Sequence, residues 1–178
     1  MKTIKTLCIT LLTIFIFSNA VCNKKIKFEK LIDGASTTFI AQPQAAGPYN
    51  FSETVKFNLE EQLKPYDVSL TQVTKVVVES VTIAIEDTTV APVTFDIVDF
   101  VNLELGSSSI ANVQVAFKNP VPHTGLSVIS PDLAPEYDVL PLAKGNDLTY
   151  HFTGNLNAAL THQIKMKVTI KWKITAEL

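Results

Sequence analysis

The side chains best suited to chemistry in this chain are carboxylates that lie close together in segments without a clear strand pattern. They form three pairs: Asp96 with Asp99, Glu86 with Asp87, and Glu136 with Asp138. Paired carboxylates act as general acid and base in hydrolysis, and their oxygens bind calcium. No pair matches the calcium loop of an EF-hand, and loop carboxylates are most often simply solvated. The pairs leave one hypothesis open, a small hydrolase or a glycan-binding module that uses loop carboxylates.

Three histidines and a run of serines add no second kind of site. His123, His151 and His162 have no other His or Cys at the spacing of a zinc site. The serines at 107–109 follow Gly106 in an expected turn, not in the G-x-S-x-G sequence of a hydrolase. The glycines are isolated and form no phosphate-binding loop. We therefore predict no catalytic residue, no metal and no cofactor.

Cys22 has distinctive chemistry, because its thiol can be acylated. Residues 1–20 have the three parts of an export signal, namely a positive start, an apolar run and small residues at the end. Cleavage there leaves residues 21–178 as one domain. Cys22 is the sole cysteine of that mature chain, because Cys8 lies in the signal. An intrachain disulfide is therefore excluded.

Two outcomes stay open for Cys22. Acylation, as in bacterial lipoproteins, would make it the first residue and anchor the domain to a membrane, at the outer membrane or in the periplasm. Ordinary cleavage after Ala20 would leave a free thiol on a periplasmic or secreted protein. Asn19 and Val21 depart from the usual lipobox, which favours Leu and a small residue at these places. The apolar run of the signal is too short to remain as a transmembrane helix.

The last expected strand, 164–175, places lysines on one face. Apolar and polar residues alternate along it without a break, which predicts one dry face, with Trp172 buried, and one wet face. The wet face carries Lys165, Lys167, Lys171 and Lys173. These cations can contact an anionic surface such as lipid headgroups. The alternative is that lysines protect an edge strand from aggregation.

Composition limits the partners of the chain. Apolar residues make up 47% of the sequence and charged residues 18%, which is typical of a chain with a large core and not of a disordered one. Every basic residue is lysine, and the net charge is −2. Arginine is the preferred side chain for phosphate and guanine. We therefore predict no nucleic-acid partner.

The elements that position these residues are predicted to be strands. Short apolar or alternating runs recur at roughly ten-residue spacing, separated by turn residues. They lie at 25–32, 36–41, 49–57, 75–85, 101–105, 110–118, 126–129, 148–152 and 164–175. The pattern predicts an all-β fold, a single antiparallel β-sandwich of about eight or nine strands, immunoglobulin-like or related. One short helix is expected after Asn58, which with Glu61 forms a capping box, and Pro65 ends it.

Several local features refine this prediction. Asp33 and Gly34 are typical of a turn that would pair the first two strands as a hairpin. Glu79 interrupts an apolar face and indicates a sheet edge or a bulge. Phe117 has inward parity in its strand.

Two segments are harder to assign. Residues 93–105 fit either one strand or a helical turn at 95–100 that leads into a shorter strand. Gly154 and Asn155 are expected to end the strand before them. Residues 130–144, with their prolines, are expected to be an irregular crossover.

The sequence Cys22-Asn23-Lys24-Lys25 after the export signal, a single β-sandwich and an alternating last strand resemble small uncharacterised envelope lipoproteins of Gram-negative bacteria. The resemblance covers the whole chain and implies location and fold. It implies no known activity.

Two classes of function follow. The first is an exported, membrane-anchored, non-enzymatic domain of the bacterial cell envelope that binds a protein, glycan or lipid or has a structural role. The second is the small secreted hydrolase or glycan-binding module. Aromatic side chains on a wet face beside carboxylates would favour sugar binding.

Overall fold

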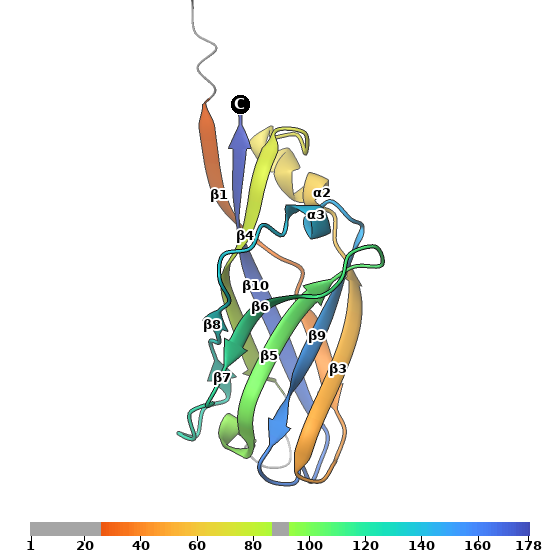
Figure 1. Cartoon of the computed structure of the whole chain (residues 1–178), viewed down its shortest axis with the longest axis vertical. Coiled ribbons are helices and arrows are strands. Elements are labelled where there is room, and N and C mark those ends of the chain that lie inside the picture. Colours follow the sequence, from red (N-terminus) through yellow and green to blue (C-terminus); the bar gives the residue numbers. More distant parts are fainter. Residues whose placement is uncertain (1–25, 87–92) are drawn as a thin grey trace, which may run out of the picture.

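The structure, a computed structural model, describes residues 26–86 and 93–178, which pack around one apolar core. Their strands pair antiparallel into two five-stranded sheets that face each other (Figure 1). Since strands with one dry face must bury it, two such sheets packed face to face are the stable arrangement. The predicted antiparallel β-sandwich is confirmed.

We name each sheet after its central strand. The β10 sheet has the order β1-β10-β4-β7, with β2 also beside β10, and consists of β1 (Lys27–Asp33), β2 (Thr37–Ala41), β4 (Val73–Ile85), β7 (Val128–Ile129) and β10 (Ile164–Glu177). The β9 sheet has the order β3-β9-β5-β6-β8 and consists of β3 (Gly47–Lys56), β5 (Val98–Gly106), β6 (Val113–Lys118), β8 (Asp132–Leu133) and β9 (Asp147–Leu156). Figure 1 shows the β9 sheet in front of the β10 sheet. Among the described residues there are ten strands, and β8 is the one that the sequence did not indicate.

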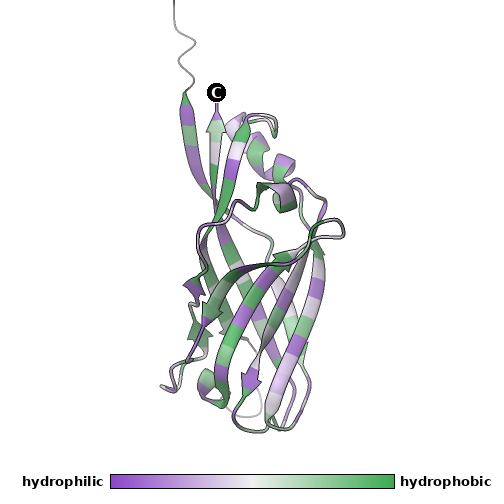
Figure 2. Ribbon diagram, in the orientation of Figure 1, coloured by the Kyte–Doolittle hydropathy of each residue, from purple (hydrophilic) through white to green (hydrophobic). Residues whose placement is uncertain are grey.

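β10 behaves as its alternation predicts. Its inward residues are buried from Ile164 to Ala176, and the green and purple bands along the strands in Figure 2 follow this period. Trp172 is 0% exposed, and its ring centroid lies 4.6 Å from that of Phe57. The predicted burial of Trp172 is therefore confirmed. The position of β10 differs from an edge strand, however, because it pairs with β1 and β2 on one side and β4 on the other.

The turn predicted at Gly34 does not form a hairpin. β1 and β2 do not pair with each other, because both pair with β10, one after the other, and make one long edge. The Gly34 N–H donates to the carbonyl of Ile170 at 2.8 Å. A Cβ on Gly34 would lie 2.8 Å from the Trp172 indole nitrogen. Glycine is needed here for close approach to the indole, not for a hairpin turn.

A β-bulge lies at Glu79, as the sequence indicated. Lys171 pairs with Ser80 and the next residue, Trp172, pairs with Val78, so Glu79 has no partner on β10. Its side chain is exposed. Because of this extra residue, apolar side chains before and after Glu79 both point into the core.

A second bulge overturns the predicted inward position of Phe117. Leu103 pairs with Ala116 and the next residue, Glu104, pairs with Gln114, so Val115 is the extra residue in β6. Val115 and Ala116 are both buried as a result. The parity of the strand then changes, and Phe117 is 39% exposed on the outer side.

Gly154 and Asn155 lie inside β9 and do not end it, contrary to the prediction. A Cβ on Gly154 would overlap the Phe100 carbonyl oxygen and the Tyr49 ring. Glycine within this strand therefore allows its two neighbours to approach closely. The absence of a side chain marks tight packing here, not a turn.

The helical elements are short. α2 (Leu59–Leu63) begins where expected, because the Asn58 side chain accepts from the Glu61 N–H at 3.2 Å. The 3-10 turn Phe95–Ile97 precedes β5, so the second interpretation of 93–105 is confirmed in part: the turn is shorter than 95–100, and the strand begins at Val98, earlier than expected. α3 (Leu140–Ala143) was not predicted, because the prolines of 130–144 indicated an irregular segment. Its own proline lies in the first helical turn, where proline is compatible with a helix.

Candidate functional site

Cys22, the export signal and Asp87 lie outside the described residues. Figure 1 shows β1 with its first residues at the tip of the molecule, where the β10 sheet extends beyond the β9 sheet. Within 26–86 and 93–178, no helix has the length and apolar character that a bilayer crossing requires.

Two of the predicted loop carboxylates hold backbone groups. Asp138 accepts from the N–H groups of Val76 and Leu140, at 3.0 Å each. Asp96 accepts from the Gly125 N–H at 2.9 Å. The bonds of Asp138 satisfy part-buried donors, and the bond of Asp96 holds an exposed loop, so both side chains have a structural role.

The other three described carboxylates are paired with side chains, and Glu86 lies 3.6 Å from Lys167. Asp99 accepts from the Asn155 amide at 2.7 Å. Glu136 accepts from the Lys75 ammonium at 2.5 Å, and this hydrogen bond and the lysine charge hold the pKa of Glu136 below its usual range. None of these five carboxylates lines the open cleft described below.

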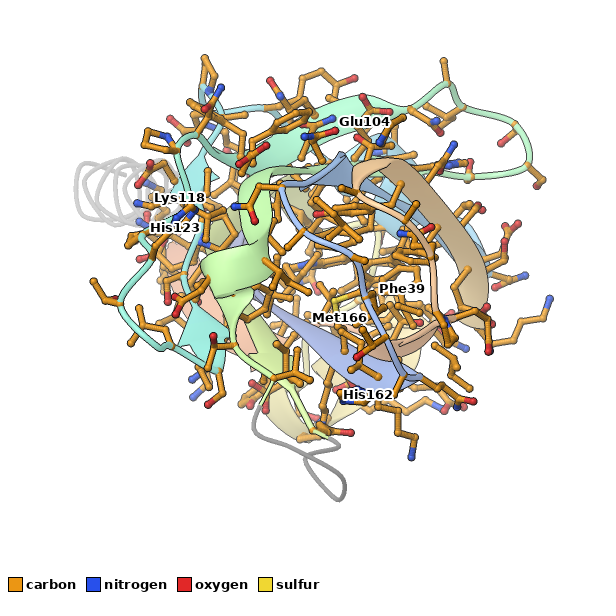
Figure 3. The ribbon with its side chains drawn as sticks, turned by 90° about the horizontal axis from the view of Figure 1, so that it is seen from below. Phe39, Glu104, Lys118, His123, His162 and Met166 are labelled. Atoms are coloured by element: carbon orange, nitrogen blue, oxygen red, sulfur yellow. The ribbon has the colours of Figure 1, made fainter. Side chains whose placement is uncertain are left out.

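The histidines lie apart. Figure 3 shows His123 and His162 at separate places on the periphery, and His151 lies on β9 between Ser52 of β3 and Glu104 of β5. That row resembles a serine–histidine–carboxylate order, but it crosses an open sheet face whose backbone N–H groups serve the strand ladders. It offers no oxyanion donors. In the described part of the chain, no three His, Cys, Asp or Glu side chains could hold a metal ion.

The lysine face, defined by Lys165, Lys167, Lys171 and Lys173, lies on the outer side of the β10 sheet. Lys167 is 3.6 Å from Glu86, and Lys173 is 3.4 Å from Glu29. Among the described residues, Lys165 and Lys171 have no carboxylate within 4.0 Å. Because β10 is central, protection of a sheet edge does not explain this row.

An open cleft of about 500 Å³ lies beside α2, and we call it the α2 cleft. Four segments line it: the junction of β1 and β2, the end of β3, α2, and the turn before β9. Its residues are Asp33, Gly34, Ala35, Lys56, Phe57, Asn58, Glu61, Gln62 and Asn146. Most are polar and exposed, so they present carboxylate, amide and ammonium groups to a ligand.

Hydrogen bonds fix the walls of the α2 cleft. The Tyr150 hydroxyl donates to the Ala35 carbonyl and joins the two sheets behind the cleft. The Phe57 N–H donates to the Asn146 carbonyl at 3.2 Å. Asp33 and Glu61 are both exposed to water. A general acid is usually a carboxyl removed from water, so this arrangement suits binding better than catalysis.

The outer side of the β9 sheet has a different composition, and we call it the hydroxyl–amide face. Strand register and exposure place on it Asn50, Ser52 and Thr54 of β3, Asn102 and Glu104 of β5, Gln114 of β6, and Thr149, His151, Thr153 and Asn155 of β9. In Figure 3, Glu104 lies outside the sandwich, whereas Phe39 and Met166 lie between the sheets. Two exposed aromatic rings, Phe100 at 37% and Phe117 at 39%, lie at its margin.

Sequence reasoning missed both the α2 cleft and the hydroxyl–amide face. The cleft combines residues from distant segments, and no local pattern indicates that they meet. The face was partly visible as the polar positions of alternating strands. Its aromatic margin was hidden in part: alternation with Val101 already directs Phe100 outward, whereas the bulge at Val115 reverses the parity of Phe117.

Comparison with known proteins gives no family. No protein-family model matches the chain, and no curated protein matches it. Among solved structures, a chain titled Desmodium yellow mottle tymovirus is 12% identical, and the match covers 89% of this chain and 85% of that chain. Its TM-score is 0.28, and at that value the likeness carries no argument.

Proposed function

We propose that this chain is an exported, non-enzymatic domain of the bacterial cell envelope that is anchored through an acylated Cys22. It binds a polar ligand in the α2 cleft. The observation that carries the proposal is the cleft itself, because four separate segments bring exposed polar side chains to one open hollow. The export signal and the sequence after Cys22 support the location.

Within this proposal, the lysine face contacts anionic headgroups of the membrane that holds the anchor. Each lysine near such a surface adds about 1 kcal/mol. Lys165 and Lys171 provide more of this attraction, because Glu86 and Glu29 form ion pairs with the other two lysines. Asp33 lies opposite Lys171 in the strand register and reduces the share of that lysine. The partner through the anchor is the membrane, and the ligand in the cleft is a glycan, a peptide or another polar molecule.

The location is tested by mass spectrometry of the mature N-terminus and by membrane fractionation of a Gram-negative host that produces the full chain. We expect an acylated Cys22 in the membrane fraction, and a soluble periplasmic product from Cys22→Ser. An unmodified N-terminus at Val21 would reject the anchor.

Ligand binding is tested by thermal shift with neutral oligosaccharides, amino sugars and dipeptides. A ligand of the cleft should stabilise the wild type and not Glu61→Gln. Glu60→Gln is the matched control, because Glu60 is on the same helix and does not line the cleft. Equal stabilisation of both variants would place the ligand elsewhere.

A hydrolase is the second candidate, and the presence of Asp33 and Glu61 in one cleft favours it. The same oligosaccharides, incubated with the protein and analysed for new reducing ends, decide between the two. Turnover that Asp33→Asn or Glu61→Gln abolishes would replace binding with catalysis.

A further inference from the structure

We propose that the hydroxyl–amide face is a second binding surface, which takes a neutral polysaccharide chain across Phe100 and Phe117. This inference goes beyond the α2 cleft and does not depend on a ligand there. It rests on the aromatic margin of the face, its ordered amide network and its charge.

Two phenyl rings stand at the edge of a wet sheet face. Phe117 pairs with Asn102, and Phe100 lies two residues before Asn102 on the same side of β5. Such diagonal neighbours lie about 7–8 Å apart. Flat, adjacent apolar rings on an otherwise polar surface are typical of a binding site. A pyranose ring presents its C–H groups on one face, and these pack against the negative face of an aromatic ring.

The polar groups beside the rings are held in place by one another. The Gln114 side-chain amide donates to the side-chain oxygen of Asn102 (Oδ1) at 2.5 Å, and the Asn102 side-chain amide donates to Glu104 at 3.2 Å and to Thr153 at 3.4 Å. This chain of bonds crosses three strands, β6, β5 and β9. Side chains ordered in this way lose little freedom when they bind the hydroxyl groups of a sugar.

Further polar groups continue the surface toward β3. The hydroxyls of Thr54 and Thr149 lie 2.9 Å apart, in direct cross-strand register. Hydroxyl and amide groups both donate and accept, as the hydroxyls of a sugar do. A chain that crosses the sheet would therefore meet matched partners from Phe117 to Thr54.

The charge of the face selects a neutral chain. Glu104 is the one carboxylate among its ten residues, and none of the ten is a lysine. Lys56 and Asp147 continue the same parity beyond Thr54 and Thr149, and they lie opposite each other, so their charges offset. Asp99 lies beside Phe100 in sequence, and Asp132 pairs with Phe117, where Lys118 offsets it at 3.1 Å. These carboxylates repel an anionic polymer, whereas the hydroxyls of a neutral one can bind them.

Affinity electrophoresis of the full chain tests the inference. The native gels contain hydroxyethylcellulose, xylan, galactomannan or amylose, with alginate as the anionic comparison. We expect at least one neutral polysaccharide to retard the wild type, and Phe117→Ser to weaken the affinity about tenfold. Phe117→Tyr should retain binding, because it keeps the ring. Leu31→Ser is the matched control, since Leu31 is 51% exposed on the other sheet.

Each alternative result overturns the inference. The inference is rejected if none of the four neutral polysaccharides retards the wild type, or if alginate retards it equally. Unchanged retardation of both Phe100→Ser and Phe117→Ser would also reject it. Loss of retardation in Glu61→Gln alone would assign the polysaccharide to the α2 cleft, which supports the proposed function and rejects this surface. A wild type that elutes as a dimer, with Phe117→Ser as a monomer, would show that a second copy covers the rings. The emission spectrum of Trp172 verifies that each variant is folded.

Discussion

The outer faces of the two sheets are built on the same alternation and have opposite character. The outer side of β10 carries four lysines, and two of them are partly neutralised, Lys173 by Glu29 of β1 and Lys167 by Glu86, which follows β4. The outer side of the β9 sheet carries hydroxyls, amides and two exposed phenyl rings. The cationic face suits long-range attraction, which salt screens. The neutral face suits contact at short range, because hydrogen bonds and ring packing act only at touching distance.

Under the proposed membrane anchor, this difference gives the two outer faces separate binding roles. The lysine face belongs to the sheet that extends toward the tip where β1 begins (Figure 1). The hydroxyl–amide face belongs to the opposite layer. A domain held to a membrane through residues before β1 could therefore turn one sheet toward headgroups and leave the other open to a glycan.

The largest expected effect comes from a substitution in the core that lies between the two sheets. Trp172→Ala should lower the free energy of unfolding by about 3–5 kcal/mol, because it removes a fully buried ring that packs against Phe57. Denaturant unfolding followed by circular dichroism measures the loss. Leu31→Ala, at an exposed position on the neighbouring strand, should change stability by about 0.5 kcal/mol or less. A similar loss in both variants would contradict the packing.

The next effect strains the sheet that carries the hydroxyl–amide face. Gly154→Ala should cost about 1–3 kcal/mol, because its Cβ would overlap the Phe100 carbonyl and the Tyr49 ring. The strain displaces β5 at Phe100, so polysaccharide retardation should weaken while binding to anionic vesicles stays unchanged. Thermal unfolding and affinity gels measure the two effects. A stable Gly154→Ala protein with normal retardation would show that β5 tolerates the side chain.

Much of the fold could be predicted from the sequence, because strand periodicity is local. The alternation of β10, the cap at Asn58 and the bulge at Glu79 are each visible within a few residues. Long-range contacts caused the errors. Gly34 and Gly154 resemble turn signals in sequence, but each is glycine because another segment passes close to it.

The candidate sites show the same difference between local patterns, which could be predicted, and long-range contacts, which could not. The lysine face was predicted because a single strand carries all four cations. The carboxylates Asp96 and Asp138 were predicted as site candidates, yet their partners, Gly125 and Val76, are distant in sequence. The α2 cleft joins Asp33 to Asn146, and no local pattern contains that information.

A smaller effect separates Lys165 and Lys171 from the two lysines that form ion pairs with glutamates. In the Cys22→Ser background, where no acyl chain masks the result, changing Lys165 and Lys171 to Gln should weaken binding to vesicles of phosphatidylcholine and phosphatidylglycerol by about 2 kcal/mol. Changing Lys167 and Lys173 should cost less, because their carboxylate partners lie within 4.0 Å. Vesicle sedimentation at low salt measures both. Equal losses would mean that the ion pairs do not reduce the available charge.

The smallest effect concerns Glu29, the carboxylate that links β1 to the lysine face. Hydrogen bonds from Lys27, at 2.7 Å, and from Lys173, together with the charges of both, hold the pKa of Glu29 below its usual range. A pKa that is lower in the folded state contributes stability above the unfolded value, and this stability is lost as pH falls through the folded value. Glu29→Gln should therefore melt slightly below the wild type at neutral pH and low salt. The difference should disappear in acid, where Glu29 is protonated, and in high salt, which screens an exposed pair. Thermal unfolding across pH and salt measures it, and a difference that persists in acid would show that Glu29 acts through packing and not through charge.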